Sequence, residues 1–270
     1  MIIDCHAHIM SSPSLLECED TLLASMDKYG VDFALVSNCG AAEFPTGASA
    51  EVSGKDALTC LKETMTFVKQ YPTRLGAAVW IRPVFEKGPS RELREYVSNN
   101  RDHIFALKFH PYAERTRVDS PLLEPYLDWA EKERLPVLVH TAEDEYSDVD
   151  FLVNVANLRP KIRFIAAHLQ LLSDHSKGVE ALRKAPNIYA DTAWVPMKIS
   201  AKVLRSIGPS RMMFGTDNPI DGLDTLSNPM YADYFKNKSR LSACLWKRLM
   251  SRNAIDLFSL PFPKDFSEVQ

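Results

Sequence analysis

The sequence lacks the features that mark several large classes of protein. No apolar run in its 270 residues approaches the roughly 18 that a membrane-spanning helix needs, so we expect no membrane partner. The formal net charge is −3 and no block of lysine and arginine occurs, which argues against nucleic-acid binding. The N-terminus also lacks the basic and then apolar layout of a secretory signal.

Cysteines are few, and none belongs to a Cys-x-x-Cys pair. The five are odd in number and scattered along the chain: Cys5, Cys18, Cys39, Cys60 and Cys244. This pattern indicates reduced thiols rather than a disulfide framework. We therefore expect a cytoplasmic protein.

The chain does contain short apolar segments that alternate with amphipathic ones, in a composition typical of a soluble enzyme. Strands are predicted at residues 1–8, 31–37, 75–81, 104–109, 137–139, 163–167, 187–191 and 212–214. Helices are predicted at residues 15–29, 56–71, 88–99, 121–134, 148–158, 177–185, 197–207, 234–250 and 253–258. The loop at 38–55 is longer than most connections, and such loops are usually either functional or disordered.

This alternation predicts parallel strands joined by right-handed crossovers. Eight such units, without a linker-like break, favour a (β/α)8 TIM barrel that forms a single domain over residues 1–270. A doubly wound open sheet is the alternative. It is less favoured because no glycine-rich phosphate loop follows the first strand.

Histidines collect at the ends of the predicted strands. Five of the seven lie at the C-terminal ends of predicted strands, namely His6, His8, His110, His140 and His168, and Asp217 takes the same place on the last strand. The C-terminal ends of barrel strands converge on one mouth, where catalytic groups are found. The pattern therefore predicts that these side chains meet in one site.

The first strand ends in Asp4-Cys5-His6-Ala7-His8. Because side chains alternate along a strand, Asp4, His6 and His8 are expected to share one face, and two imidazoles so placed can bind one metal ion. By the same alternation Cys5 is expected to point away from the metal and to pack in the core. Asp4 could bond to a ligand imidazole or to backbone groups at the barrel floor.

Six short motifs occur in an order that resembles the amidohydrolase superfamily, and specifically the amidohydrolase-related branch that includes non-oxidative decarboxylases. They are Asp4-Cys5-His6-Ala7-His8, Leu107-Lys108-Phe109-His110-Pro111, Pro136-Val137-Leu138-Val139-His140-Thr141, Ala166-Ala167-His168, Phe214-Gly215-Thr216-Asp217-Asn218-Pro219 and Arg252-Asn253-Ala254. Each motif is weak alone, but together they span nearly the whole chain.

The resemblance implies that His6, His8, His140 and Asp217 hold one divalent metal ion. Three imidazoles and a carboxylate suit Zn²⁺, with Mn²⁺ as the alternative. The resemblance also implies catalytic roles for two residues: Asp217 would accept a proton from water and pass it to the leaving group, and His168 would orient or polarise the substrate.

Four further residues are predicted to bind the substrate. His110 and Lys108 end the fourth strand, and we favour Lys108 as a substrate-carboxylate anchor or a buried ion-pair partner over a bridge between two metals. Arg82 and Trp194 lie just beyond the third and seventh predicted strands, and Trp80 and Asp191 lie at the ends of these strands. All four are expected to line the pocket. Arg82 could hold a substrate carboxylate, although a structural salt bridge is the alternative.

The sequence thus predicts a metal-dependent hydrolase that attacks a small amide, lactone or ester with metal-activated water. The alternatives are a non-oxidative decarboxylase of a small aromatic or unsaturated acid, and a barrel that binds ligands without catalysis. A barrel-type deoxyribonuclease is less favoured, because the usual strand-four glutamate is missing. The expected partner is a small carboxylate-bearing molecule. Both a monomer and a homo-oligomer are compatible with the sequence.

Overall fold

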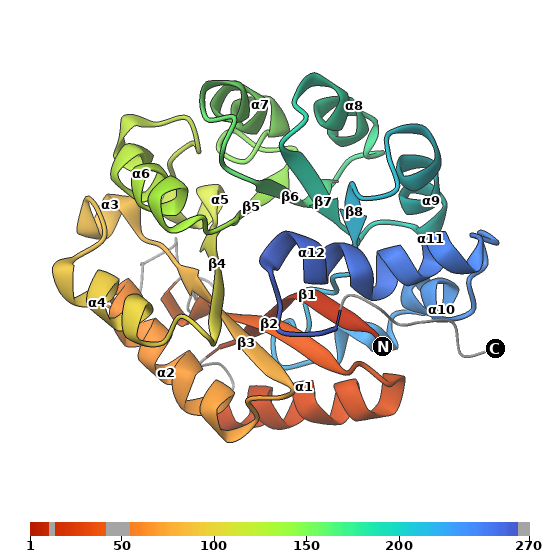
Figure 1. Ribbon diagram of the computed structural model, residues 1–270, viewed down its shortest axis with the longest axis horizontal. Helices are drawn as coiled ribbons and strands as arrows, with labels where there is room; N and C mark the ends of the chain where they lie inside the picture. The colour runs from red at the N-terminus through yellow and green to blue at the C-terminus, as the bar shows by residue number, and fades with distance from the viewer. Residues whose placement is uncertain (11–13, 42–54, 264–270) are drawn as a thin grey trace.

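The computed structural model describes residues 1–10, 14–41 and 55–263 of the chain. Its centre is a sheet of eight parallel strands that lie side by side in sequence order (Figure 1). The strands are β1 (Ile3–Ile9), β2 (Phe33–Asn38), β3 (Leu75–Trp80), β4 (Ile104–Phe109), β5 (Val137–Ala142), β6 (Phe164–Leu171), β7 (Ile188–Asp191) and β8 (Met212–Met213). All eight predicted strands are present, and β5 continues past its predicted end so that it includes His140.

The sheet closes on itself because the chain after β8 bonds to β1. The Cys5 N–H donates to the Phe214 carbonyl and the His8 N–H to the Asn218 carbonyl, both at 2.9 Å. Ala7 and Asn218 form a parallel bridge beyond the end of β8. These bonds complete the predicted (β/α)8 barrel, and they bring residues 214–218 beside the histidines of β1.

Helices follow the strands around the outside of the barrel. They are α1 (Leu15–Tyr29), α2 (Ala57–Gln70), α3 (Pro83–Glu86), α4 (Arg91–Asn99), α5 (Pro111–Glu114), α6 (Glu124–Glu133), α7 (Val149–Leu158), α8 (Ser176–Lys184), α9 (Met197–Ser206), α10 (Pro229–Phe235), α11 (Ala243–Lys247) and α12 (Asn253–Phe258). Short turns are η1 (Cys39–Ala41), η2 (Pro121–Leu123) and η3 (Thr225–Ser227), and η4 (Arg248–Arg252) is a π-helical turn. The predicted loop at 38–55 falls largely on residues 42–54, which lie outside the described residues.

Local signals account for most helix ends. The Ser14 hydroxyl accepts from the Glu17 N–H at the start of α1, and Gly30 ends the helix with a φ of 68°. A side-chain oxygen acceptor at the first position and a left-handed glycine after the last satisfy backbone groups that the helix leaves unpaired. The predicted bounds of α1 are therefore those of the structure.

The predicted helix at 234–250 is wrong. The structure instead has α10, which ends at Phe235, and α11, which begins at Ala243. Asn237 and Arg240 adopt left-handed backbone conformations between them, with φ of 46° and 50°. The Ser242 hydroxyl then accepts from the Leu245 N–H and starts a new helix. Apolar periodicity ran across this break because both helices pack on the same core.

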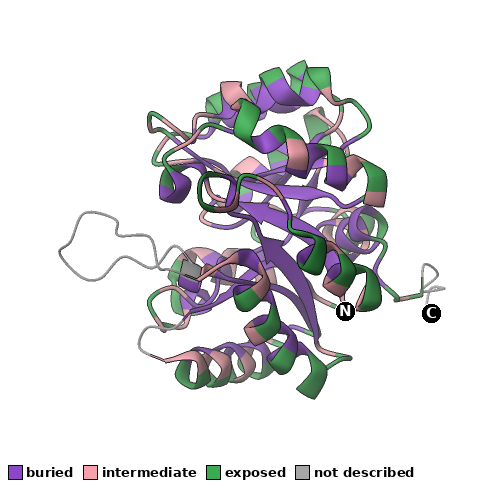
Figure 2. Cartoon of the chain, turned by 90° about the vertical axis from the view of Figure 1, so that its left-hand side faces the viewer, coloured by how far each residue is buried: buried purple, intermediate pink, exposed green. Residues whose placement is uncertain are grey.

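The core has two parts. The larger part lies between the barrel and its helices and includes Val36, Val79 and Val139, which point outward from the strands. Figure 2 shows the buried strands between helices whose outer faces are exposed. The smaller part fills the inside of the barrel, where strand residues such as Ile3 and Phe105 pack against α12. In Figure 1, α12 crosses the middle of the barrel, and it covers the N-terminal ends of the strands.

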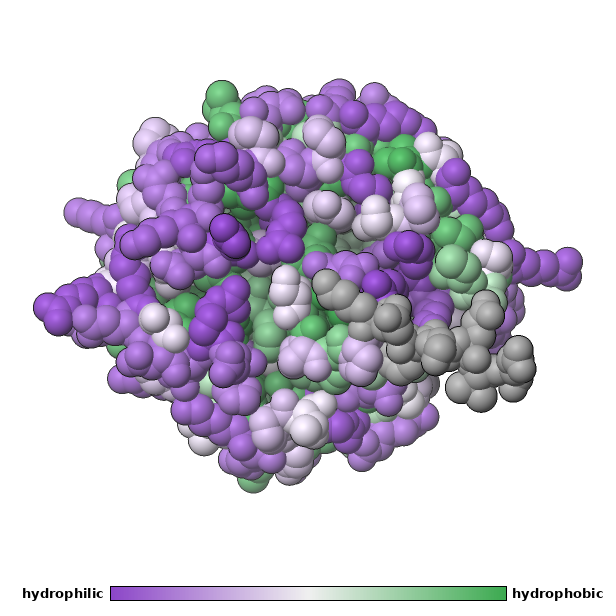
Figure 3. All heavy atoms as spheres, in the orientation of Figure 1, coloured by the Kyte–Doolittle hydropathy of each residue, from purple (hydrophilic) through white to green (hydrophobic). Residues whose placement is uncertain are grey.

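On the face that Figure 3 shows, hydrophilic side chains predominate around the rim and hydrophobic ones are concentrated toward the middle. Within the described ranges, no helix is both long and apolar enough to cross a membrane. None of the five cysteines forms a disulfide.

A substitution at Gly178 would test how closely α8 packs on β6. A Cβ atom at this position would lie 2.4 Å from the Leu169 carbonyl oxygen, which is backbone and cannot move aside. We expect Gly178→Ala to lower the free energy of unfolding by about 1–3 kcal/mol, the range for overpacking a core, as measured by urea denaturation. Gly208→Ala is the matched control, because its Cβ would meet only the flexible Arg211 side chain at 3.2 Å. Equal effects of the two changes would contradict the packing argument.

Candidate metal centre and active site

Three side chains from opposite ends of the sequence converge at the C-terminal mouth of the barrel. The Nε2 atoms of His6 and His8 are 3.1 Å apart. The Asp217 Oδ1 atom lies 3.1 Å from Nε2 of His6 and 2.9 Å from Nε2 of His8. All three residues are buried. The structure thus brings these three predicted site residues into contact.

The opposite nitrogen of each imidazole is held by an acceptor from the protein. The Nδ1 of His6 lies 2.8 Å from an Asp191 carboxylate oxygen, and the Nδ1 of His8 lies 3.2 Å from the Ser37 carbonyl. The Nδ1 of His168 lies 3.3 Å from the Ala193 carbonyl. The Nδ1 atoms of His6 and His168 therefore carry the proton, and their Nε2 atoms are left with a lone pair. The Nδ1 of His8 also lies 2.9 Å from the Ser37 hydroxyl, and when this nitrogen donates to the Ser37 carbonyl, the Nε2 of His8 has a lone pair as well. Metal-binding histidines in proteins are held in this way.

Two imidazole lone pairs and a carboxylate oxygen repel one another unless a cation or an extra proton lies among them. Burial lowers the pKa of His6 well below its ordinary value, and the nearby Lys108 lowers it further. Burial by itself would raise the pKa of Asp217, but the imidazoles of His168, His6 and His8 outweigh it and lower that pKa. The site therefore favours an ionised Asp217 carboxylate beside a neutral His6 imidazole, and both groups bind metal in that state.

The observed separations suit such an ion. Zinc bonds of about 2.0–2.1 Å in tetrahedral geometry place neighbouring ligand atoms about 3.3 Å apart. The three pairs of atoms above are separated by 2.9–3.1 Å. Ligand atoms of His6, His168 and Asp217 also lie within 4.8 Å of one another. The residues present therefore fit a divalent metal ion.

His140, the fourth predicted ligand, lies in a stack of rings beside this cluster. Its ring is stacked on His110 with centroids 3.8 Å apart and meets the edge of His168 at 4.7 Å. Trp80 is also stacked with His110, with ring centroids 5.7 Å apart. Burial lowers the pKa of both His110 and His140 well below the ordinary value. These three rings form an aromatic stack, and its His140 end meets His168.

Lys108 reaches the same point from β4. Its Nζ lies 2.8 Å from Nε2 of His6, and the side chain is buried. Burial lowers the pKa of Lys108 to about 8, and the charges of Asp217 and Asp191 oppose that effect. The group is therefore mainly a cation at neutral pH and lies beside the candidate metal ligands.

Arg82 faces a different environment from the one that a substrate anchor needs. Its guanidinium lies 3.2 Å from a Glu114 carboxylate oxygen and donates to the Lys55 carbonyl. The side chain is fully buried and Glu114 is nearly so. Of the two roles considered for Arg82, the contacts favour the structural salt bridge.

Trp194 contacts Asp217 rather than only lining a pocket wall. Its indole Nε1–H donates to Oδ2 of Asp217 at 2.9 Å. Both oxygens of this carboxylate are therefore engaged, one by Trp194 and the other by the histidine pair.

The prediction that Asp4 shares one face of β1 with His6 and His8 is wrong. The register of β1 against β2 shifts between Asp4 and Ala7, so alternation breaks inside the motif. Asp4 accepts from the backbone of His6 and Thr216 and from the Thr216 hydroxyl, which is the second of its two predicted roles. Cys5 packs in the core as expected, in the part that fills the inside of the barrel.

The sequence predicts Asp191 only as a residue that lines the pocket, and it does not reveal that Asp191 also holds the His6 ring. Its carboxylate accepts from the His6 ring at 2.8 Å and from the backbone N–H groups of His168 and Ala193 at 2.9 and 3.1 Å. Its position at the end of the seventh strand was the available signal. His168, Trp194 and Asp217 also have φ values of 60–66°, which aim their side chains without a glycine to mark the turn.

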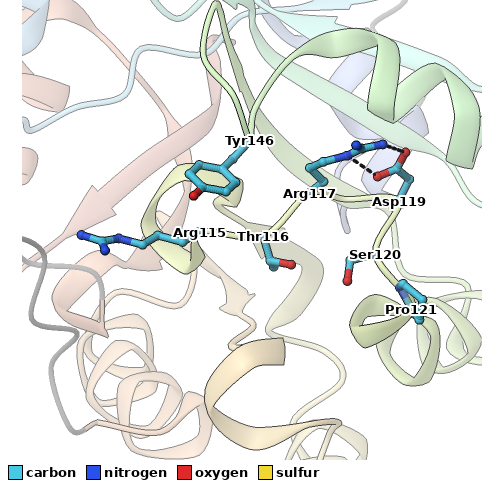
Figure 4. Close-up of a pocket in the computed structure, with 7 residues that line it drawn as sticks. All are labelled: Arg115, Thr116, Arg117, Asp119, Ser120, Pro121 and Tyr146. Atoms are coloured by element: carbon cyan, nitrogen blue, oxygen red, sulfur yellow. Dashed lines mark hydrogen bonds and ion pairs between the residues drawn. The ribbon is translucent and has the colours of Figure 1, made fainter.

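A separate surface cavity of about 370 Å³ lies among the loops after β4 and β5 (Figure 4). Figure 4 shows Arg117 paired with Asp119 on one side and Tyr146 near Arg115 on the other. None of the residues predicted from the sequence to form the site lines this cavity.

The barrel and its histidine–aspartate cluster define the class of the protein, a (β/α)8 barrel with a candidate metal centre at its C-terminal mouth. The amidohydrolase family model matches residues 3–260, and the chain belongs to that family. No curated protein matches the chain at a significant level.

Solved structures share the fold at low sequence identity. The 5-carboxyvanillate decarboxylase of Sphingomonas paucimobilis is 14% identical with a TM-score of 0.68, over 96% of this chain and 99% of that one. The Novosphingobium aromaticivorans enzyme of the same name, in complex with manganese and a nitrobenzoic acid, is 14% identical with a TM-score of 0.70, over 96% of each chain. A probable 2-pyrone-4,6-dicarboxylic acid hydrolase of Acinetobacter baumannii, with citric acid bound, is 12% identical with a TM-score of 0.65, over 96% and 99%.

Asp191 provides a test of the metal centre that leaves the ligands intact. We expect Asp191→Asn to weaken Zn²⁺ binding about 10–100-fold, because the amide no longer holds the His6 ring through a charged bond. Isothermal titration of metal-depleted protein measures the change. Asp174→Asn is the control, since Asp174 is exposed and bonds only to Ser176. Unchanged affinity in Asp191→Asn would contradict the assignment.

The lowered pKa of His168 leads to a prediction of how the stability of the metal-depleted protein depends on pH. Burial lowers its pKa to about 4 from an ordinary 6.5, so below pH 6.5 the unfolded chain binds a proton that the folded protein does not. Stability should therefore fall as pH falls, by about 3 kcal/mol between pH 6.5 and 4 from this residue. Urea denaturation at several pH values should show a smaller decline in His168→Gln.

Asp4 does not disturb this comparison. Burial raises its pKa to about 7, so it titrates in the opposite sense, and it does so in both proteins. If wild type and His168→Gln lose stability in parallel, the buried neutral state of His168 is wrong.

Proposed function

We propose that the chain is a metal-dependent hydrolase that acts on an amide, lactone or ester of a small, carboxylate-bearing molecule. The observation that carries the proposal is the convergence of Nε2 of His6, Nε2 of His8 and Oδ1 of Asp217. Membership of the amidohydrolase family supports it, as do solved structures of the same fold that are described as hydrolase or decarboxylase enzymes.

We propose one ion per chain, Zn²⁺ with Mn²⁺ as the alternative, held by His6, His8, His140 and Asp217. A bound ion supplies a more acidic water and polarises the substrate oxygen. Asp217 accepts the proton of the attacking water and returns it to the leaving group, because its carboxylate is ionised and its Oδ2 keeps a second lone pair. His168 presents a lone pair at Nε2, so it orients a water or a substrate N–H or O–H rather than donating to a carbonyl.

Of the remaining predicted residues, Lys108 and His110 would contact the substrate, whereas Arg82 would not. Lys108 supplies a buried cation beside the histidine pair, which suits a substrate carboxylate. His110 lies in the aromatic stack with His140 and Trp80, and its ring edge suits an aromatic or apolar part of the substrate. Arg82 would instead stabilise the loop after β3 through its ion pair with Glu114.

The second candidate is a non-oxidative decarboxylase of an aromatic acid. The aromatic stack of Trp80, His110 and His140 beside the Lys108 cation favours it, since aromatic side chains and a nearby cation suit an aromatic carboxylate. Several solved structures with this fold are described as decarboxylases of hydroxybenzoates or carboxyvanillate. The two functions share the metal centre and differ in their products.

Metal content and products test the proposal together. Elemental mass spectrometry of protein purified without added metal should find about one ion per chain. We expect His6→Ala to lose the metal and Asp217→Asn to lower turnover by at least about 100-fold. Lactones, amides, esters and aromatic acids are then screened for a new acid, alcohol or amine and separately for carbon dioxide.

The controls separate the outcomes. His103→Ala removes a histidine that precedes β4, at the opposite end of the barrel, and should change neither metal content nor turnover. Carbon dioxide as the product establishes the decarboxylase in place of the hydrolase. A folded wild type that takes up no ion after reconstitution overturns both functions.

A further inference from the structure

Asp217 is held from two sides. Its Oδ1 lies at the histidine pair, whereas its Oδ2 accepts from the Trp194 indole at 2.9 Å. Trp194 belongs to the loop after β7, and its backbone is left-handed with a φ of 60°. A residue other than glycine keeps this conformation only when surrounding contacts hold it there.

Tyr231 of α10 provides that contact. Its hydroxyl accepts from the Trp194 backbone N–H at 3.0 Å and donates to the Thr216 carbonyl at 2.9 Å. Thr216 directly precedes Asp217, so one hydroxyl joins the loop that carries the indole to the segment that carries the carboxylate. Tyr231 is fully buried and lies outside the cluster of histidines.

We propose that Trp194 and Tyr231 are positioning residues that set the orientation of the Asp217 carboxylate. The terminal torsion of an aspartate is soft, so the ring of ligands by itself does not fix which oxygen faces the histidines. The indole N–H holds Oδ2, and Tyr231 holds the indole through its backbone. Loss of either contact leaves a buried polar group without its partner and loosens the carboxylate.

This inference rests on the proposed function, in which Asp217 is a metal ligand, and it differs from the role first expected for Trp194. A residue that only lines the substrate pocket affects metal binding little when its ring is kept. A residue that orients Asp217 affects metal binding when only its N–H is removed. Trp194→Phe distinguishes these roles, because it keeps an aromatic ring but removes the donor.

The test is titration of the metal-depleted full chain with Zn²⁺ by isothermal calorimetry. We expect Trp194→Phe to weaken binding by at least about tenfold and Tyr231→Phe by a smaller factor. The double variant should lose less affinity than the product of the two single losses, because Tyr231 acts on Asp217 partly through the same indole contact.

Two variants match these changes elsewhere in the chain. Tyr234→Phe removes a buried hydroxyl one turn further along α10, which bonds to Ser200 and to the Val195 carbonyl. Trp246→Phe removes an indole N–H that donates to the Tyr234 carbonyl. Both should keep wild-type Zn²⁺ affinity, and thermal melting checks that every variant is folded. If Tyr231→Phe does not fold, Trp194→Phe carries the test.

Two further results have separate meanings. Wild-type affinity in both Trp194→Phe and Tyr231→Phe, with Zn²⁺ bound to wild type, overturns the inference and leaves the proposed function in place. A wild type that binds no Zn²⁺ overturns the proposed metal centre, and the positioning role with it. An equal loss in Tyr234→Phe would show that the effect is general destabilisation and would also overturn the positioning role.

Discussion

The hydrogen bonds between β1 and the chain after β8 are the contacts on which the site depends. The Asp217 N–H donates to the His6 carbonyl at 2.7 Å, and the His8 N–H donates to the Asn218 carbonyl at 2.9 Å. They close the barrel and at the same time place Asp217 against two histidines that are more than 200 residues away in the chain. Without closure these side chains would lie at opposite edges of an open sheet.

Closure also creates an electrostatic problem that the structure solves locally. Burying imidazole and carboxylate groups together is costly unless each has a partner. Asp191, Ser37 and Ala193 accept from the outer nitrogens of His6, His8 and His168, whereas the inner nitrogens face one another and Asp217. The donors and acceptors around the cluster therefore define both the protonation of the rings and the point where a cation is favoured.

Sequence reasoning succeeded for features that depend on local pattern. Strand and helix periodicity located all eight strands, and cap residues located the ends of α1. It failed where a local break is hidden by a continuous apolar pattern, as between α10 and α11. It also failed at the register shift in β1, because strict alternation was assumed across Cys5 and His6. A bulge is set by pairing with the neighbouring strand, which a single segment does not reveal.

The sequence by itself determined the barrel and the set of polar residues at its mouth, because parallel β/α units place every strand end on the same side. Only the tertiary structure decided which partner each of these residues contacts. It paired Arg82 with Glu114, gave Asp191 to the His6 ring, and turned Trp194 toward Asp217. These choices depend on left-handed turns and on contacts between loops distant in sequence, and no local propensity encodes them.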